Sequence, residues 1–129
     1  MSDEARLLFA NEAFYAAFAA GDLEAMTAVW SDAEPLFCLH PGWPLLAGRA
    51  AILESWSGIL AADVSAMRME APSAWLQGEV GVVLCREVLG PSVLAATNLF
   101  RLEAGQWRLF HHHAGATRAV PSAGPSVMQ

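Results

Sequence analysis

The spacing of apolar residues changes once along this chain, and that change constrains the fold more than any other feature. Up to Leu60, apolar side chains recur at helical spacing, as at Ile52, Trp56 and Ile59. From Val64 onward they alternate with polar residues, which is the period of a strand with one buried face. A helical half followed by a strand half predicts an α+β domain whose helices cover one face of a sheet.

Three helices are expected in the first half. Gly21 suits the left-handed end of the first helix, Asp22 can cap the second, and Gly48 opens the third. The expected ranges are 4–20, 23–30 and 48–60. One short strand, residues 36–40 (LFCLH), lies between the second and third helices and is closed by the turn formers PGWP.

Glycine turns join four longer strands into an antiparallel meander in the second half. The expected strands are 64–76, 79–89, 92–103 and 107–115. A curved, mainly antiparallel sheet closed by three N-terminal helices forms a cone-shaped roll with a cavity, and cavities are where small ligands bind. We expect residues 1–116 to form this single domain, and residues 117–129, rich in Pro, Ser and Gly, to form a mobile tail.

The composition argues against several classes of partner. The net charge is −6, and the seven Lys and Arg residues are scattered, so no basic stripe for nucleic acid is present. No apolar run is long enough to span a membrane, and the acidic start MSDEA has the wrong charge for a secretory signal. Cys38 and Cys85 form no CxxC and are interpreted as buried thiols in a reducing cytoplasm. We therefore expect a cytoplasmic protein, and no cofactor is indicated.

The hairpin at Gly90-Pro91 allows a register to be predicted. A short turn there places Glu87 opposite Leu94 and Val83 opposite Asn98, and opposed residues share a face. That face would carry Val83, Cys85, Glu87, Leu94, Ala96, Asn98 and Phe100. Glu87 and Asn98 are its only polar members, and a buried carboxylate needs a partner or must keep its proton.

The triplet His111–His113 can supply that partner. A three-residue turn at 104–106 places His112 opposite Asn98. Phe110 and Ala114 would share its face, whereas Trp107, Leu109, His111 and His113 would point away. A change of one residue in the turn exchanges the two sets.

Three interpretations of the triplet stay open. One histidine can line a pocket beside Glu87 and Asn98, or the histidines can pack at a dimer interface or bond to the backbone. A metal site would use His111 and His113, but no acidic or Cys ligand is near in sequence, so no metal is predicted. His40 is a second candidate, with Trp43 able to close a cavity mouth beside it, although it can equally be a loop histidine in solvent. The other expected pocket residues are Phe14, Phe18, Trp30, Phe37, Trp43, Trp56, Cys85, Phe100 and Phe110.

Three segments and their spacing carry a resemblance to a known superfamily. FYAAFAAGDLEAMTAVWSDAEPLF, GRAAILESWSGIL and TNLFRLEAGQWRLFHHHAG resemble the nuclear-transport-factor-2-like superfamily over about residues 4–116, closest to SnoaL-like proteins and the association domain of calcium/calmodulin-dependent kinase II. The resemblance implies the fold and a homodimer formed through the outer sheet face. It does not imply one function, because the superfamily includes isomerases, cyclases, dehydratases, hydrolases and proteins without catalysis.

Ketosteroid isomerase, a member of that superfamily, uses a carboxylate base with a tyrosine and a protonated aspartic acid. Aligned on AGDL, its tyrosine falls on Phe14, its base on His40 and its aspartic acid on Asn98. Phe14 has no hydroxyl, so the steroid-isomerase set is absent. A changed set is chemically possible, with His40 as base, Asn98 as donor, and Glu87 with His112 as a proton-transfer pair.

Three functions follow from these observations. The leading one is a dimer that binds an unidentified small molecule without established catalysis. The alternatives are a SnoaL-like isomerase, cyclase or lyase that uses acid–base chemistry, and an oligomerising association module. Association domains of the kinase type carry pocket arginines, and Glu87 and Ala114 stand at two of those positions here, so a small anion is a less favoured ligand.

Overall fold

The computed structural model describes residues 1–119, so residues 120–129 of the expected tail lie outside the described residues. The first half forms helices α1 (Asp3–Ala20), α2 (Leu23–Val29) and α3 (Arg49–Leu60), with short strands β1 (Phe37–Leu39) and β2 (Leu46–Ala47) before α3. The second half forms β3 (Arg68–Gln77), β4 (Val80–Leu89), β5 (Ser92–Glu103) and β6 (Gln106–Ala116). Within the described residues, no helix combines the length and apolar character that a membrane span needs.

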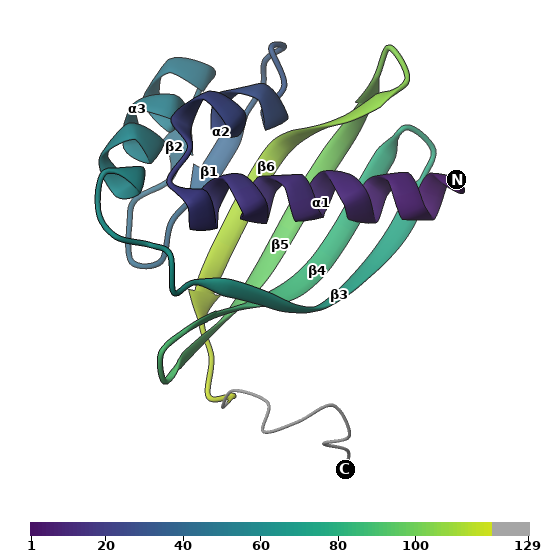
Figure 1. The fold of residues 1–129 in the computed structure, drawn as a ribbon. Coiled ribbons are helices and arrows are strands. Elements are labelled where there is room, and N and C mark those ends of the chain that lie inside the picture. Colours follow the sequence, from purple (N-terminus) through teal and green to yellow (C-terminus); the bar gives the residue numbers. More distant parts are fainter. Residues whose placement is uncertain (120–129) are drawn as a thin grey trace.

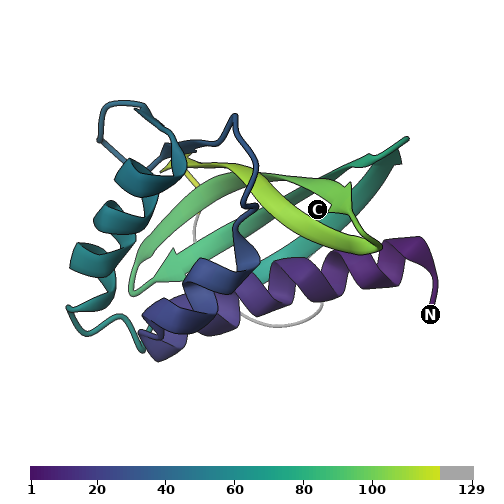
Figure 2. The same cartoon turned by 90° about the horizontal axis from the view of Figure 1, so that it is seen from above.

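One curved sheet carries the fold, in the strand order β2-β1-β6-β5-β4-β3 (Figure 1). β3 to β6 form the predicted antiparallel meander, and β1 joins it in parallel with β6. Helix α1 runs across the strands, whereas α3 packs against β1 and β2 at the other end (Figures 1 and 2). The predicted fold class is confirmed: three helices pack on a curved, mainly antiparallel sheet.

Two element boundaries differ from the prediction. β3 begins at Arg68 rather than at residue 64, because residues 61–67 form turns that leave the end of α3. One strand was predicted between the second and third helices, at 36–40, but the structure has two there, because the two-residue strand β2 folds back on β1. A strand of two residues has no periodic pattern that the sequence could display.

The predicted caps at the junction of α1 and α2 are confirmed. Gly21 adopts φ 64°, the left-handed conformation that glycine accepts without strain, and its N–H bonds to the carbonyl of Phe18. Asp22 accepts a hydrogen bond from the backbone N–H of Ala25 at 3.0 Å and so caps α2. The chain therefore reverses within two residues, which brings α2 beside α1.

The helices and the sheet enclose one apolar core. Phe14 of α1 makes edge-on ring contacts with Tyr15 and with Trp56 of α3. At the far end of α1, Leu7 lies against Gly81 of β4, where an added Cβ would come within 2.6 Å of the leucine side chain. These contacts fix how α1 lies over the sheet, and so they fix which of its side chains reach the strands.

A short turn before β6 and a β-bulge within it make one part of the register differ from the prediction. Leu99 pairs with His111, but the next residue, Phe100, pairs with Leu109, so Phe110 has no partner across the ladder. Leu109 is therefore buried in the core, as is Trp107, and their predicted outward orientation is wrong. Phe110, predicted on the face of His112, is only half-buried and has the Arg101 guanidinium 4.5 Å from its ring centroid. The predicted three-residue turn at 104–106 is wrong, because the turn has two residues, with Glu103 opposite Gln106, and this exchanges the faces of the residues that follow. The bulge shifts the register back by one residue, so the predicted pairing of Asn98 with His112 holds.

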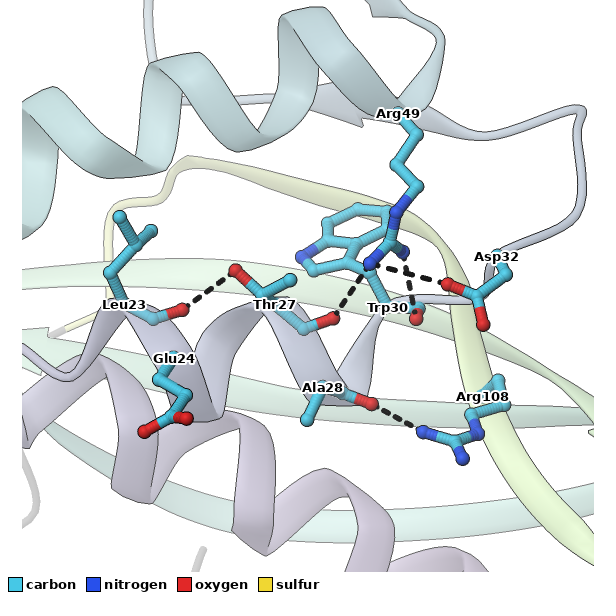
Figure 3. Close-up of a pocket in the computed structure, with 8 residues that line it drawn as sticks. All are labelled: Leu23, Glu24, Thr27, Ala28, Trp30, Asp32, Arg49 and Arg108. Carbon is cyan, nitrogen blue, oxygen red and sulfur yellow. Dashed lines mark hydrogen bonds and ion pairs between the residues drawn. The ribbon is translucent and has the colours of Figure 1, made fainter.

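Arg49 of α3 holds the C-terminal end of α2 (Figure 3). Its guanidinium donates to the carbonyl oxygens of Ser31 at 2.6 Å, Trp30 at 3.1 Å and Thr27 at 3.2 Å. Carbonyls at a helix C-terminus lack partners within the helix, and a helix of seven residues is marginal without tertiary contacts. Arg49 therefore ties α2 to α3.

We expect Arg49→Met to lower the free energy of unfolding by about 2 kcal/mol, because it leaves these carbonyls without charge-assisted bonds while keeping the apolar stem. Urea unfolding monitored by tryptophan fluorescence measures the effect. Arg6→Met, which removes an exposed arginine that pairs with Asp3, is the control and should change stability by less than about 1 kcal/mol. Equal effects of the two substitutions would show that Arg49 does not secure α2.

Candidate functional site

Three neighbouring strands and one helix bring four polar side chains together inside the protein. Glu87 comes from β4, Asn98 from β5, His112 from β6 and Tyr15 from α1, and all four are buried. The predicted pairings are confirmed: Glu87 lies opposite Leu94, and Asn98 lies opposite both Val83 and His112. The inward orientation predicted for His112 follows from this register.

Hydrogen bonds join these groups into one network. The amide nitrogen of Asn98 donates to Asn11 Oδ1 at 2.9 Å and to the Tyr15 hydroxyl at 3.1 Å. Tyr15 in turn donates to Glu87 Oε2 at 2.7 Å. On the other side, His112 Nδ1 and Asn98 Oδ1 are 2.6 Å apart. His112 Nε2 lies 3.7 Å from Glu87 Oε2, which brings the network back to the carboxyl group.

These bonds define the tautomer of His112. The amide nitrogen of Asn98 points toward Asn11 and Tyr15 and donates to both. The group that faces His112 is therefore the carbonyl oxygen of Asn98, which can only accept a hydrogen bond. His112 must therefore carry its proton on Nδ1, and Nε2 presents a lone pair toward Glu87. A neutral imidazole in this state is a hydrogen-bond acceptor and can take up a proton at Nε2.

Burial keeps both ionisable partners neutral. It raises the pKa of Glu87 to about 7, although the hydrogen bond from Tyr15 acts in the opposite direction. Burial, followed by positive charge on His40, lowers the pKa of His112 to about 3. At a pH between these two pKa values, the contact at 3.7 Å between Glu87 and His112 joins a carboxylic acid and a neutral imidazole rather than two ions. Burial, followed by the charge of Glu87, also holds the pKa of Tyr15 far above its usual range, so Tyr15 remains a donor.

His40 is buried at the end of β1, and the solvent-exposed alternative considered for it is wrong. Ser55 of α3 donates its hydroxyl hydrogen to the Ile52 carbonyl at 2.6 Å, so its oxygen accepts from His40 Nε2 at 2.9 Å. Burial lowers the pKa of His40 to about 4. The ring is held edge-on by Trp43 and Trp56, each with its centroid 4.8 Å away, and its centroid is 6.4 Å from that of His112.

A cavity of about 220 Å³ lies beside these groups. Its polar lining consists of His40, Glu87 and His112. The remaining lining is apolar: Phe18, Pro41, Trp43, Ile59, Val64, Met67, Leu89 and Leu94. The exposed members Pro41, Trp43 and Leu89 lie where the cavity meets the surface, as expected for a mouth. Asn98 stands one layer behind the wall, where it holds His112.

The structure distributes the predicted aromatic and thiol residues over three places. Phe18 and Trp43 line the cavity. Five others belong to the core around it: Phe14, Trp30, Trp56, Cys85 and Phe100. Phe37 packs against His111 on the face opposite to His112, with 6.4 Å between ring centroids, and Phe110 was displaced by the bulge. Cys38 and Cys85 are free and buried, as predicted.

A second, more open cleft lies between α2 and α3 (Figure 3). It measures about 510 Å³ and is lined in part by Arg49 and Arg108. Both guanidinium groups already bond to backbone carbonyls, Arg49 as described above and Arg108 to that of Ala28. Their arrangement is that of a helix end held in place, whereas Glu87, His40 and His112 line the smaller cavity.

Three side chains of this candidate site were missed by sequence reasoning. Tyr15 supplies the phenol that the alignment with ketosteroid isomerase sought at Phe14, and Asn11 and Ser55 anchor Asn98 and His40. Asn11 and Tyr15 lie four residues apart and thus on one face of α1. That spacing, with the only tyrosine of the chain, was the available signal. In residues 1–119, no three or more His, Cys, Asp or Glu side chains are grouped as a metal ion would need.

Comparisons with known proteins agree with this architecture. The family model of the SnoaL-like domain matches residues 8–118. A candidate dehydratase of the NTF2-like family from Streptomyces avermitilis is 31% identical, with a TM-score of 0.80 over 91% of this chain and 97% of its own. A candidate calcium/calmodulin-dependent protein kinase type II association domain from Thiobacillus denitrificans is 32% identical, with a TM-score of 0.73 over 84% and 93%.

A ketosteroid isomerase-like protein from Erwinia carotovora atroseptica, 19% identical, shares the fold with a TM-score of 0.77 over 92% of this chain and 98% of its own. Among curated proteins, none matches the sequence. These solved structures share one fold but are named after different functions, so the similarity does not distinguish catalysis, binding and association.

Proposed function

This chain belongs to the SnoaL-like domain family, and we propose that it binds a small molecule in the cavity beside Glu87 and His112. One observation carries the proposal: two buried, uncharged but ionisable side chains stand on the wall of an otherwise apolar cavity. Burying such groups costs stability that apolar residues would not cost. A site that retains them next to a cavity fits a ligand-binding role better than a purely structural one.

A second candidate function is acid–base catalysis, as in an isomerase, cyclase or lyase. It is favoured by a carboxyl group whose pKa of about 7 allows it to give and accept a proton near neutral pH. In this role Glu87 is the general acid or base, and His40 and His112 are neutral acceptors beside it. Asn98 acts as a positioning residue because its amide hydrogens are already used. The candidate dehydratase from Streptomyces is consistent with proton transfer.

Assembly and location form the third part of the proposal. Trp75 and Leu84 are exposed on the sheet face that points away from the core, and they support a homodimer formed through this face. The two free, buried thiols agree with a reducing cytoplasm. The association-domain relative fits the alternative of an oligomerising module without favouring it.

Filling the cavity is expected to abolish binding. Leu94 lines the cavity and is only partly buried, so Leu94→Trp should fit while occupying the ligand's place. Leu99→Trp, on the opposite face of the same strand, is the matched control. NMR spectra of the backbone amides, recorded with a mixture of neutral single-ring compounds, should show shifts around the cavity in wild type and Leu99→Trp only. Shifts elsewhere, or shifts that survive Leu94→Trp, would contradict the assignment of the site.

A substrate, once found, separates the two candidates. Glu87→Gln should reduce turnover by about 10²- to 10⁴-fold if Glu87 transfers a proton, while leaving binding within a few-fold. Under a binding role alone, the same variant would alter affinity only.

A further inference from the structure

The cavity wall presents a donor and an acceptor that do not satisfy each other. His112 Nε2 offers a lone pair, since its proton is on Nδ1, and neutral Glu87 offers an acidic hydrogen. Their separation of 3.7 Å exceeds the usual hydrogen-bond range of about 2.7–3.2 Å. Among the residues that the structure describes, no other protein donor reaches Nε2. A molecule in the cavity can therefore form hydrogen bonds with both Glu87 and His112 at once.

A hydroxyl group fits this pair better than other functional groups. Its oxygen accepts one hydrogen bond and its hydrogen donates another, so it can accept from Glu87 and donate to His112. An oxygen about 2.8 Å from both atoms is compatible with their spacing of 3.7 Å. A carbonyl or ether oxygen can only accept, and it would leave Nε2 of His112 without a donor. A buried acceptor left without a donor weakens binding.

The charge of the wall argues for a neutral ligand. Within the described residues, neither Arg nor Lys lines the cavity, so a carboxylate or phosphate would enter without a counter-charge. An ammonium group would need Glu87 to ionise in surroundings whose burial raises the carboxyl pKa. Water can also bridge Glu87 and His112, and a ligand hydroxyl would replace it with the same bonds.

The remaining wall sets the size and character of the ligand. Phe18, Ile59, Val64, Met67 and Leu94 give an apolar surface. The volume of about 220 Å³ is below the roughly 300–1,000 Å³ of drug-sized sites, and it equals the volume of about seven waters. That space suits a single ring with its hydroxyl at one edge.

We propose that the ligand class of this cavity is a small, neutral, single-ring alcohol whose hydroxyl lies between Glu87 and His112. The inference rests on the proposed binding function and narrows it. The ligand's hydroxyl accepts a hydrogen bond from Glu87 and donates one to His112, while its ring packs against the apolar wall.

Five probes that share a six-membered ring and differ in its substituent test the inference in wild-type protein at pH 6, by calorimetry or by NMR titration. They are cyclohexanol, cyclohexanone, methylenecyclohexane, cyclohexanecarboxylate and cyclohexylammonium. We expect cyclohexanol to bind about tenfold tighter than the ketone and the hydrocarbon, because only the alcohol satisfies both groups. The two ions should not bind measurably. In the complex, the nitrogen-15 resonance of His112 Nε2 should shift as its lone pair accepts the hydroxyl hydrogen.

A variant at Glu87 tests whether this side chain causes the preference for the alcohol. Glu87→Met keeps the length of the side chain and removes the donor, so the advantage of cyclohexanol over methylenecyclohexane should largely disappear. If that variant does not fold, the wild-type comparison alone decides. A ketone, a hydrocarbon or an ion that binds as tightly as the alcohol would overturn the ligand class and leave the binding function in place. Failure of every neutral ring to bind would overturn both.

Discussion

Glu87→Gln is expected to stabilise the protein by about 3 kcal/mol at pH 8, and this advantage over the wild type should develop between about pH 4.5 and pH 7. Burial raises the pKa of Glu87 from 4.5 to about 7 in the folded state. Between those values the native state binds more protons than the unfolded state, so stability falls as pH rises. The destabilisation is complete above pH 7, where the buried carboxyl is ionised, and glutamine does not ionise. A shift of this size corresponds to about 3 kcal/mol.

The groups that face Glu87 support this direction. Tyr15 from α1, Cys38 from β1 and Cys85 from its own strand all keep their protons, because burial raises the pKa of each. His112 and His40 are the basic groups on the same wall, and burial lowers their pKa values to about 3 and about 4. No positive charge on this wall therefore stabilises the Glu87 carboxylate near neutral pH.

The histidines give the opposite slope on the acid side. Their folded pKa values are depressed, so stability is lost as pH falls from 6.5 toward 4, where the unfolded state binds more protons. Between pH 4.5 and 6.5 the two histidines outweigh the one carboxyl, so the stability of the wild type should rise up to about pH 6.5 and fall between there and about pH 7. Urea unfolding at a series of pH values measures both slopes. Glu79→Gln, at an exposed carboxyl in the turn between β3 and β4, is the control and should keep the wild-type profile. A Glu87→Gln profile parallel to that of the wild type would show that the carboxyl is not desolvated.

Asn98→Ala is expected to cost about 3 kcal/mol or more. The substitution leaves Asn11 Oδ1 and His112 Nδ1 without a hydrogen-bond partner and removes one of the bonds of Tyr15, and all three groups remain buried. Each buried polar group left without a partner costs about 1–3 kcal/mol, and the removed volume adds a cavity. Guanidinium unfolding measures the loss.

A second readout separates this network from simple loss of packing. Nitrogen-15 NMR should show His112 protonated on Nδ1 in the wild type, and a mixture of tautomers in Asn98→Ala. Thr97→Ala, at the neighbouring position on the outer face of β5, should change stability by less than about 1 kcal/mol. A cost below 1 kcal/mol for Asn98→Ala, or an unchanged tautomer, would contradict the network.

Local rules predicted the part of the site that lies in the sheet. β4 and β5 are joined by a tight turn, so counting from Gly90 gave the pairing of Val83 with Asn98 without tertiary information. The pairing of Asn98 with His112 was predicted in the same way. The error at Trp107, Leu109 and Phe110 arose because the turn before β6 has two residues rather than the predicted three, with Glu103 opposite Gln106. The bulge farther along β6 then restored the predicted pairing of Asn98 with His112.

The contribution of α1 could not be predicted in this way. Tyr15 and Glu87 are 72 residues apart in sequence, and their contact depends on how α1 is rotated over the sheet. Phe14 and Tyr15 differ by about 100° around the helix axis, and both have apolar rings suited to a core. Only packing, including that of Leu7 on Gly81, settles which ring meets the carboxyl group. Hydrophobic periodicity indicates the buried side of a helix more coarsely than one residue.

A crystal structure of the wild-type protein soaked with 4-bromocyclohexanol shows whether an alcohol binds beside Glu87 and His112, because the anomalous signal of bromine locates the ring without ambiguity. We expect a bromine peak in the cavity among Phe18, Ile59 and Leu94, with the hydroxyl oxygen within hydrogen-bond distance of Glu87 and His112. A cavity left without bromine at saturating probe, or a ring bound with its hydroxyl turned away from both side chains, would contradict it.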